Sequence, residues 1–317
     1  MCDHNVDVLD GKGQKTGNVV FTSHFIWSDY VPPKPSEKLD EKTMMLVTIK
    51  EATFLKDADT FGKQDPFIQF KFGGKELRTD VKDGAGKSAQ WDETFQLPDI
   101  MDQVKANGAL VFEAYDKDLA SSDLLGFTGP LEFLELVEDD KVHDFDLELF
   151  EPKGEKAGHV KLSTQLVFAQ PEPPLFATIN YNCQLEVKML EAHFFKDSGD
   201  DFGKQDPYLA FKCCGQEYRT KVKDDAGKDA TFDDVFLVSK VENAAKAGEA
   251  LIVEARDSDV AVDDVLGTAN PLTYQSLCAD EAAHAFTVDI FSEYKKAGWI
   301  KFETKFIFSE PTPGVVP

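Results

Sequence analysis

Short segments in which apolar and polar residues alternate recur along the whole chain. Examples are LVTIKEATF at 46–54, PFIQFKF at 66–72 and HVKLSTQLVF at 159–168. Alternation with a period of two places the apolar side chains on one face of a strand. Turn signals rich in Gly, Asp and Pro separate these segments every ~10 to 15 residues, a spacing typical of an antiparallel β-sandwich. The pattern predicts an all-β fold in which only 99–109 and 240–250 form short helical turns.

The first half of this pattern returns 141 residues later without a gap over a long span. The offset takes Asp65 to Asp206 and Gly126 to Gly267, until one residue is lost and Gly158 aligns with Gly298. A unit of this length is too long for a solenoid repeat and indicates a duplicated domain. The predicted organisation is domain 1 at 43–168 and domain 2 at 180–309, with linkers at 31–42 and 169–179 and a tail at 310–317.

The N-terminal segment aligns with the end of the first domain at the same offset. Residues 6–27 match residues 147–168, so that Gly17 falls on Gly158 and Trp27 on Phe168. Residues 1–30 are therefore predicted to form a β-hairpin that resembles the closing strands of a third domain. Either this hairpin packs within its own chain, or it docks on a sheet edge of another molecule and mediates oligomerisation.

The charge balance limits the function classes. The chain has 58 acidic and 34 basic residues, a net charge of −24, which argues against nucleic-acid binding and against a resting affinity for anionic membranes. An excess of carboxylates suits cation binding. The chain has no run of about 18 apolar residues and no signal peptide at its start. A cytoplasmic protein, peripheral to a membrane or to the cytoskeleton, is expected.

The cysteines and histidines limit the function classes further. The five cysteines include no CxxC pair and suggest reduced thiols. Adjacent Cys213 and Cys214 are expected to point to opposite faces of a strand, which argues against a shared metal site. No HExxH or nucleophile motif accompanies the six histidines, so no enzyme is predicted. Four aromatic residues are expected in the cores because of their strand alternation: Trp91, Phe95, Phe232 and Phe236.

Two acidic segments occur in each copy. DADTFGKQDPF at 57–67 returns as SGDDFGKQDPY at 198–208, and YDKDLASSDLLG at 115–126 returns as RDSDVAVDDVLG at 256–267. A β-sandwich can bring these loops to one end, where the crowded carboxylates would require a cation. Hard oxygen ligands favour Ca²⁺, and the absence of His and Cys disfavours zinc and copper. Asp201 and Asp263 are additional carboxylates in these loops, which could either substitute as ligands or merely add charge.

Two competing motifs fail. An EF-hand starting at Asp57 would need a Glu where Ile68 stands. A phosphate loop at 83–88 would need an earlier glycine where Val81 stands, and its second copy ends in Asp229.

The motifs D-x5-D-P-[FY], QWDETF at 90–95 and D-x-D-x(n)-D-x-L-G resemble the C2 domain, the β-sandwich of protein kinase C and synaptotagmin. The closing strands resemble the type II order of the small plant elicitor-responsive C2 proteins. The resemblance implies two antiparallel eight-stranded C2 β-sandwiches in tandem. It also implies two Ca²⁺ cups, formed by Asp59, Asp65, Asp116, Asp118 and Asp123 and by Asp200, Asp206, Asp257, Asp259 and Asp264.

The function expected from this resemblance is Ca²⁺-dependent, non-enzymatic docking on anionic phospholipid membranes. The residues expected to contact the membrane are Phe61, Leu119, Phe202, Val260 and Val262. The alternative is a structural subunit or scaffold of a cytoskeletal, cortical or ciliary assembly, in which the C2 domains bind protein partners. The resemblance is compatible with one Ca²⁺ ion per cup and with two.

Overall fold

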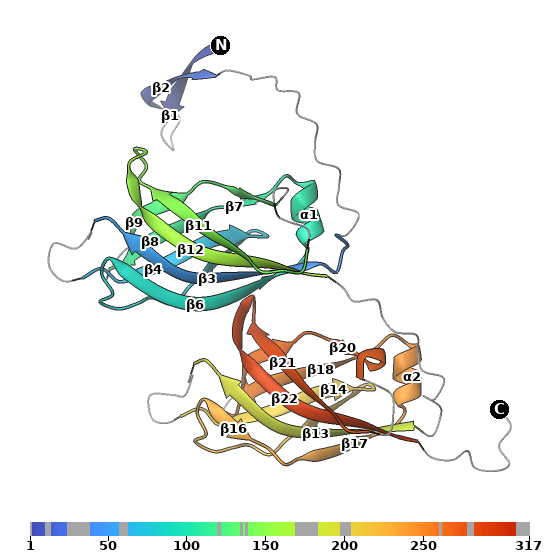
Figure 1. Ribbon diagram of the computed structural model, residues 1–317. Coiled ribbons are helices and arrows are strands. Elements are labelled where there is room, and N and C mark those ends of the chain that lie inside the picture. The colour runs from blue at the N-terminus through green and yellow to red at the C-terminus, as the bar shows by residue number, and fades with distance from the viewer. Residues whose placement is uncertain are drawn as a thin grey trace. The chain divides into compact units, whose positions relative to one another are not determined.

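A computed structural model describes most of the 317-residue chain (Figure 1). The described residues are 2–9, 14–23, 39–56, 63–118, 122–133, 136, 139–168, 183–196, 204–259, 262–277 and 282–308. The chain forms two compact units, residues 1–37 and residues 38–317. The first unit is an antiparallel hairpin of β1 (Cys2–Leu9) and β2 (Lys15–Ser23), as the sequence predicts.

The second unit contains two β-sandwiches, and domain 1 runs from β3 to β12. One layer pairs in the order β5–β4–β8–β9 and the other in the order β11–β12–β3–β6, all antiparallel. A short β9–β11 pairing joins the layers. The eight strands are β3 (Met44–Phe54), β4 (Pro66–Phe72), β5 (Lys75–Arg78), β6 (Ser88–Leu97), β8 (Phe112–Lys117), β9 (Ser122–Thr128), β11 (His143–Phe150) and β12 (Lys156–Val167).

Domain 2 repeats this pairing from β13 to β22. Its strands are β13 (Cys183–Phe194), β14 (Pro207–Cys213), β15 (Gln216–Arg219), β16 (Asp229–Thr231), β17 (Val235–Val238), β18 (Ala250–Asp257), β19 (Asp264–Ala269), β21 (His284–Ser292) and β22 (Lys295–Phe308). Together β16 and β17 take the place of β6. The predicted all-β tandem sandwiches are confirmed.

Short elements complete both domains. The two predicted helical turns are α1 (Ile100–Lys105) and α2 (Val241–Lys246). Small strands β7 (Ala109–Leu110), β10 (Leu131–Glu132) and β20 (Leu272–Thr273) and a 3₁₀ turn (Tyr274–Leu277) lie nearby in the sequence. Within the described part of the chain, every helix is too short or too polar to cross a membrane.

The three closing hairpins share one register. Gly17 lies opposite Val8, Gly158 opposite Leu149 and Gly298 opposite Ile290, and in each case the register shifts immediately beyond this pair. The reason for the glycine is visible in both sandwiches. A Cβ at Gly158 would lie 1.9 Å from the carbonyl oxygen of Thr53, and one at Gly298 would lie 2.0 Å from that of His193. The closing strand thus approaches the first strand too closely for any side chain.

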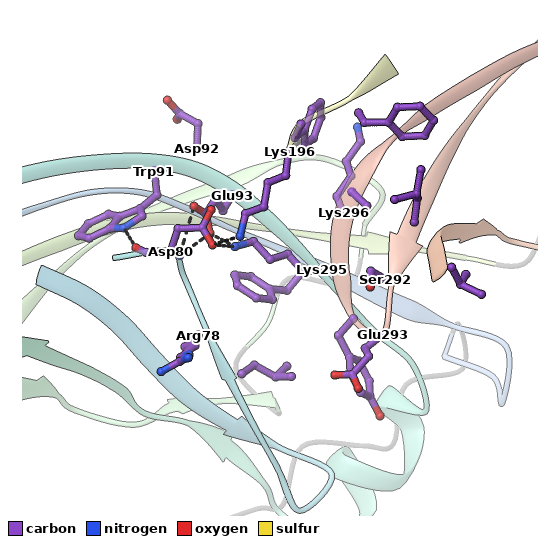
Figure 2. Close-up of a pocket in the computed structure, with 18 of the residues that line it drawn as sticks. Arg78, Asp80, Trp91, Asp92, Glu93, Lys196, Ser292, Glu293, Lys295 and Lys296 are labelled. Carbon is purple, nitrogen blue, oxygen red and sulfur yellow. Dashed lines mark hydrogen bonds and ion pairs between the residues drawn. The ribbon is translucent and has the colours of Figure 1, made fainter. Parts of the chain in front are cut away.

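The two domains touch where the turn between β21 and β22 rests on β6. The backbone N–H of Gln96 donates to the Tyr294 carbonyl oxygen at 2.7 Å. Lys295 of β22 and Phe95 of β6 lie opposite each other as antiparallel strand partners. The Lys295 ammonium lies 2.8 Å from Asp80 and 2.5 Å from Glu93. Lys196 reaches Asp80 at 2.5 Å, and Figure 2 shows both lysines converging on these carboxylates. A cleft of about 860 Å³ lies beside this contact.

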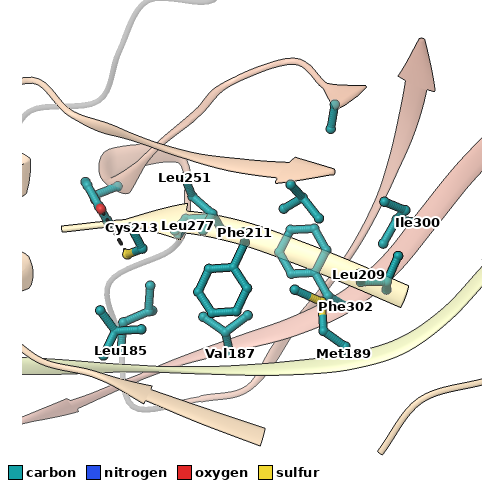
Figure 3. Close-up of a cluster of buried hydrophobic side chains, with 14 of the residues drawn as sticks. Leu185, Val187, Met189, Leu209, Phe211, Cys213, Leu251, Leu277, Ile300 and Phe302 are labelled. Atoms are coloured by element: carbon teal, nitrogen blue, oxygen red, sulfur yellow. Dashed lines mark hydrogen bonds between the residues drawn. The ribbon is translucent and has the colours of Figure 1, made fainter. Parts of the chain in front are cut away.

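Each sandwich buries its own apolar core between its layers. Figure 3 shows the domain 2 core, where Phe211 and Phe302 pack with aliphatic side chains from the facing strands. The prediction of core positions is confirmed for three aromatics, since Trp91, Phe95 and Phe232 are buried. Phe236 also packs against the core, as predicted, but it is only half-buried. Its counterpart Phe95 is covered by Lys295, whose ammonium lies 6.0 Å from the ring centroid.

Candidate functional site

Strand pairing brings three of the predicted domain 1 carboxylates to one edge. Asp65 immediately precedes β4, Asp116 lies near the end of β8, and Asp123 lies at the start of β9. Because antiparallel neighbours place the end of one strand beside the start of the next, Pro66 pairs with Asp116 and Asp116 pairs with Asp123. The sequence-predicted convergence of two distant acidic segments therefore holds for these three residues.

Hydrogen bonds fix two of these aspartates. Asp116 is 2% exposed, and its Oδ1 accepts the backbone N–H of Asp65 at 2.6 Å. The Asp65 Oδ1 accepts the N–H of Gly84 at 2.6 Å. A buried carboxylate is tolerated only with donors or a cation nearby. Asp118, one residue beyond β8, is half-buried, whereas Asp123 is exposed.

Domain 2 repeats the arrangement residue for residue. The Asp257 Oδ1 accepts the N–H of Asp206 at 2.6 Å, and the Asp206 Oδ1 accepts the N–H of Asp225 at 2.5 Å. Asp257 pairs with both Pro207 and Asp264 in the sheet. The same local chemistry therefore recurs at the same strand ends, and this recurrence is what a duplicated site requires.

Asp263 is not a spare carboxylate. Its Oδ2 accepts the Tyr208 hydroxyl at 2.7 Å, and its Oδ1 accepts the N–H of Asp259 at 3.2 Å. The hydrogen bond from Tyr208 lowers the pKa of Asp263, and burial raises the pKa of Tyr208. Domain 1 has Ser122 and Phe67 at these positions. Asp263 therefore links Tyr208 of β14 to Asp259, a role that could not be assigned from residue spacing.

Several predicted residues lie outside the described part of the chain: Asp59, Phe61, Leu119, Asp200, Asp201, Phe202 and Val260. Val262 is described between β18 and β19, and it is 77% exposed. Within the described ranges, no three His, Cys, Asp or Glu side chains are close enough to hold a metal ion. The described residues fit Ca²⁺ in donor chemistry, since each edge presents hard carboxylate oxygens, and they do not form a closed site by themselves.

The prediction that Cys213 and Cys214 point apart is wrong. Their sulfur atoms lie 3.7 Å from each other, and the Tyr274 hydroxyl lies 3.0 Å from the Cys213 sulfur. The cause is that Cys214 has left the strand and adopts φ 53 in the turn between β14 and β15. The following Gly215 was the sequence signal for this turn. The hydrogen bond from Cys213 lowers the pKa of Cys214 to about 7.

Comparisons with known proteins agree with this architecture. A family model described as "C2 domain" matches residues 44–135 and 183–282. Elicitor-responsive protein 3 of Oryza sativa subsp. japonica is 25% identical over 122 residues, which span 38% of this chain and 81% of that protein. A calcium-dependent lipid-binding protein of Arabidopsis thaliana is 30% identical over 105 residues, 31% of this chain and 19% of that protein.

Solved structures are also similar. The calcium-bound C2A and C2B domains of Extended-Synaptotagmin 2 are 18% identical, cover 84% of this chain and 97% of that chain, and give a TM-score of 0.38. A C2 domain-containing protein from a putative elicitor-responsive gene is 21% identical, with 41% and 93% coverage and a TM-score of 0.32.

Proposed function

Because this chain belongs to the C2 domain family, we propose that it is a non-enzymatic, Ca²⁺-binding tandem C2 protein. In this proposal it docks peripherally on anionic phospholipid membranes when Ca²⁺ rises. The observation that carries the proposal is the duplicated edge at which strand pairing places Asp65 beside Asp116, and Asp206 beside Asp257. The name of the calcium-dependent lipid-binding relative supports the same chemistry.

The proposed ligands extend beyond the described edge. In domain 1, Asp65, Asp116, Asp118 and Asp123 would hold the ion together with Asp59 from the first acidic loop. In domain 2, the corresponding set is Asp206, Asp257, Asp259 and Asp264 together with Asp200. Bound Ca²⁺ would supply positive charge and coordination positions that lipid phosphate oxygens can fill. The backbone donors to Asp65 and Asp206 hold these carboxylates in place before the ion arrives.

The metal-free protein is expected to stay away from anionic lipid because its net charge is −24. Once the carboxylates are neutralised, loop side chains can enter the lipid interface. The exposed Val262 is the described member of the proposed contact set, which also includes Phe61, Leu119, Phe202 and Val260. Burial of one such side chain contributes about 2 kcal/mol, so docking would depend on both the loops and the bridging ion.

Co-sedimentation with vesicles tests the proposal. Vesicles of phosphatidylserine and phosphatidylcholine are expected to pellet the protein in Ca²⁺ and not in EDTA. The variant Asp116→Asn plus Asp257→Asn should lose the Ca²⁺-dependent fraction, because Asn keeps an oxygen for the neighbouring backbone N–H and removes the charge. Asp102→Asn, which removes an exposed charge on α1, is the matched control.

Calorimetric titration with Ca²⁺ separates the ion from the membrane. Heat of binding in the wild-type chain that disappears in the double variant supports the carboxylate assignment. Failure to pellet in Ca²⁺, together with concentration-dependent oligomers, would instead favour the structural role in a protein assembly. Equal pelleting of the wild type and the double variant would refute the role given to Asp116 and Asp257.

A further inference from the structure

The domain contact covers one face of domain 1, formed by Leu77, Asp80, Glu93 and Phe95, and called here the domain 1 face. The turn at 292–296, the domain 2 turn, supplies Lys295 to both Asp80 and Glu93. The Tyr294 ring lies 6.2 Å from that of Phe72, and the Lys75 ammonium lies 4.8 Å from the Tyr294 ring centroid. Backbone pairing, two ion pairs and an aromatic contact therefore hold the turn on this face.

Among the described residues, no segment covers the same face of domain 2. The offset of 141 places Tyr218, Lys221, Asp234 and Phe236 at the four positions, called here the domain 2 face. Tyr218 stacks on Phe211 and Phe236 packs edge-on against it, and both stay half-buried. On β17, Val235 and Leu237 are 52% and 51% exposed. Among the described strands β17 pairs only with β13, so its other edge is open.

One carboxylate of the domain 2 face is only partly satisfied, since its Oδ1 accepts the Lys221 N–H at 3.4 Å. The Asp234 Oδ2 is buried and has no hydrogen-bond partner among the described residues. The equivalent Glu93 carboxylate accepts the Asp80 N–H and receives Lys295 from the domain 2 turn. Leaving a buried carboxylate oxygen unsatisfied is costly. A docked segment with a cation would remove that cost, as Lys295 does in domain 1.

The turn at 151–156, the domain 1 turn, is the matching element of domain 1, and its Glu155 lies 3.5 Å from Lys56 of the same domain. It is the counterpart of the domain 2 turn, and it is exposed over Pro152–Lys156, whereas Tyr294 and Lys295 are half-buried by docking. Its charges are reversed at two aligned positions, since Lys153 replaces Glu293 and Glu155 replaces Lys295. The charge of the domain 2 face is also reversed, because Lys221 stands where the domain 1 face has Asp80.

We propose that the domain 1 turn of one copy docks on the domain 2 face of a second copy and repeats the contact that the two domains make within one chain. Glu155, which takes the place of Lys295, then meets Lys221, and the cation for Asp234 comes instead from Lys153, which takes the place of Glu293. Within one chain the domain 2 turn lies on the domain 1 face. Among the described residues of 38–317, the domain 1 turn and the domain 2 face take no part in that contact. A contact between different surfaces of identical chains is head-to-tail and open-ended, so it builds chains of molecules and not closed dimers.

Sedimentation velocity of the full-length chain in EDTA tests this contact apart from any Ca²⁺-dependent behaviour. Average mass is expected to rise steadily as concentration increases from about 1 to 200 µM. Glu155→Lys and Lys221→Glu should each weaken the association about tenfold, because each places like charges in contact. The double variant Glu155→Lys plus Lys221→Glu restores opposite charges and should recover the association.

Lys228→Glu is the matched control, because it makes the same charge change at an exposed residue of domain 2 outside the face. A chain that stays monomeric over the whole range overturns the proposal. Association that survives both single reversals, or that the double variant fails to recover, also overturns it and assigns the contact to another surface, such as the N-terminal hairpin. Circular dichroism of each variant identifies any loss caused by misfolding, and Glu155→Gln and Lys221→Gln then provide milder versions of the same comparison.

Discussion

The domain 1 face and the domain 2 face have the same strand framework and different surroundings. Phe95 and Phe236 occupy equivalent positions, and each packs edge-on against the equivalent Phe70 or Phe211 at 5.2 Å. Phe95 is 1% exposed because the domain 2 turn covers it, whereas Phe236 is half-buried. We infer that the two layers of each sandwich determine which side chains point inward. How completely these side chains are buried depends on whether a segment from another domain covers them.

The charged residues of the two faces also have different partners. Asp80 has two lysine partners from domain 2, and Lys221 at the equivalent position has no carboxylate partner among the described residues. The apolar pattern that forms the sandwich was kept in both copies. The charges that select a docking partner differ between them.

The closing hairpins give the largest expected effect. Gly158→Ala and Gly298→Ala place a Cβ within about 2 Å of a backbone carbonyl oxygen, and each should lower the free energy of unfolding by about 5 kcal/mol, because the backbone cannot move away as a flexible side chain would. Gly17→Ala is the internal control, because a Cβ there has no atom within 4 Å, and its effect should stay within about 0.5 kcal/mol. Urea unfolding measures all three. A large loss in Gly17→Ala would show that the N-terminal hairpin is packed like the other two.

Truncation of the two phenylalanines is expected to have an intermediate effect. Phe95→Ala should cost about 4 kcal/mol, since it removes a fully buried ring. Phe236→Ala should cost about half as much, because part of that ring already contacts water. Urea unfolding of dilute protein, where association between copies is negligible, compares them. Equal losses would mean that the domain 2 face is also covered in solution.

The smallest effect concerns pH. Burial by itself raises the pKa of Asp80, but the hydrogen bonds from Lys196 and Lys295 outweigh it, and the pKa lies below the ordinary value of 3.8. A lowered pKa in the folded state means that Asp80 contributes stability above pH 3.8 and loses that contribution as pH falls further. Asp80→Asn should therefore be less stable than the wild type at pH 6, and the difference should shrink towards pH 3. A difference that grows as pH falls would contradict the ion pairs. Asp233→Asn, at an exposed position of domain 2, is the control.

The candidate site was predictable where strand ends and repeated motifs define it. Asp65, Asp116 and Asp123 lie at the start or end of strands whose alternation is clear, so their meeting at one edge followed from antiparallel pairing. The hydrogen bond from Tyr208 to Asp263 and the closeness of Cys213 to Cys214 were not predictable in this way. Both depend on how a loop or a turn bends, which a period of two does not encode.

The all-β class, the duplication, the three closing hairpins and the carboxylates at the strand ends could be predicted from the sequence, because alternation and repetition can be read along the chain. The contacts of Lys295 with Phe95 and with Asp80, which is 215 positions away, are seen only in the tertiary structure. The same holds for the buried Asp234 oxygen that has no hydrogen-bond partner among the described residues. The physical reason is that burial and ion pairing depend on which distant segments meet, and no periodicity in the chain records that meeting.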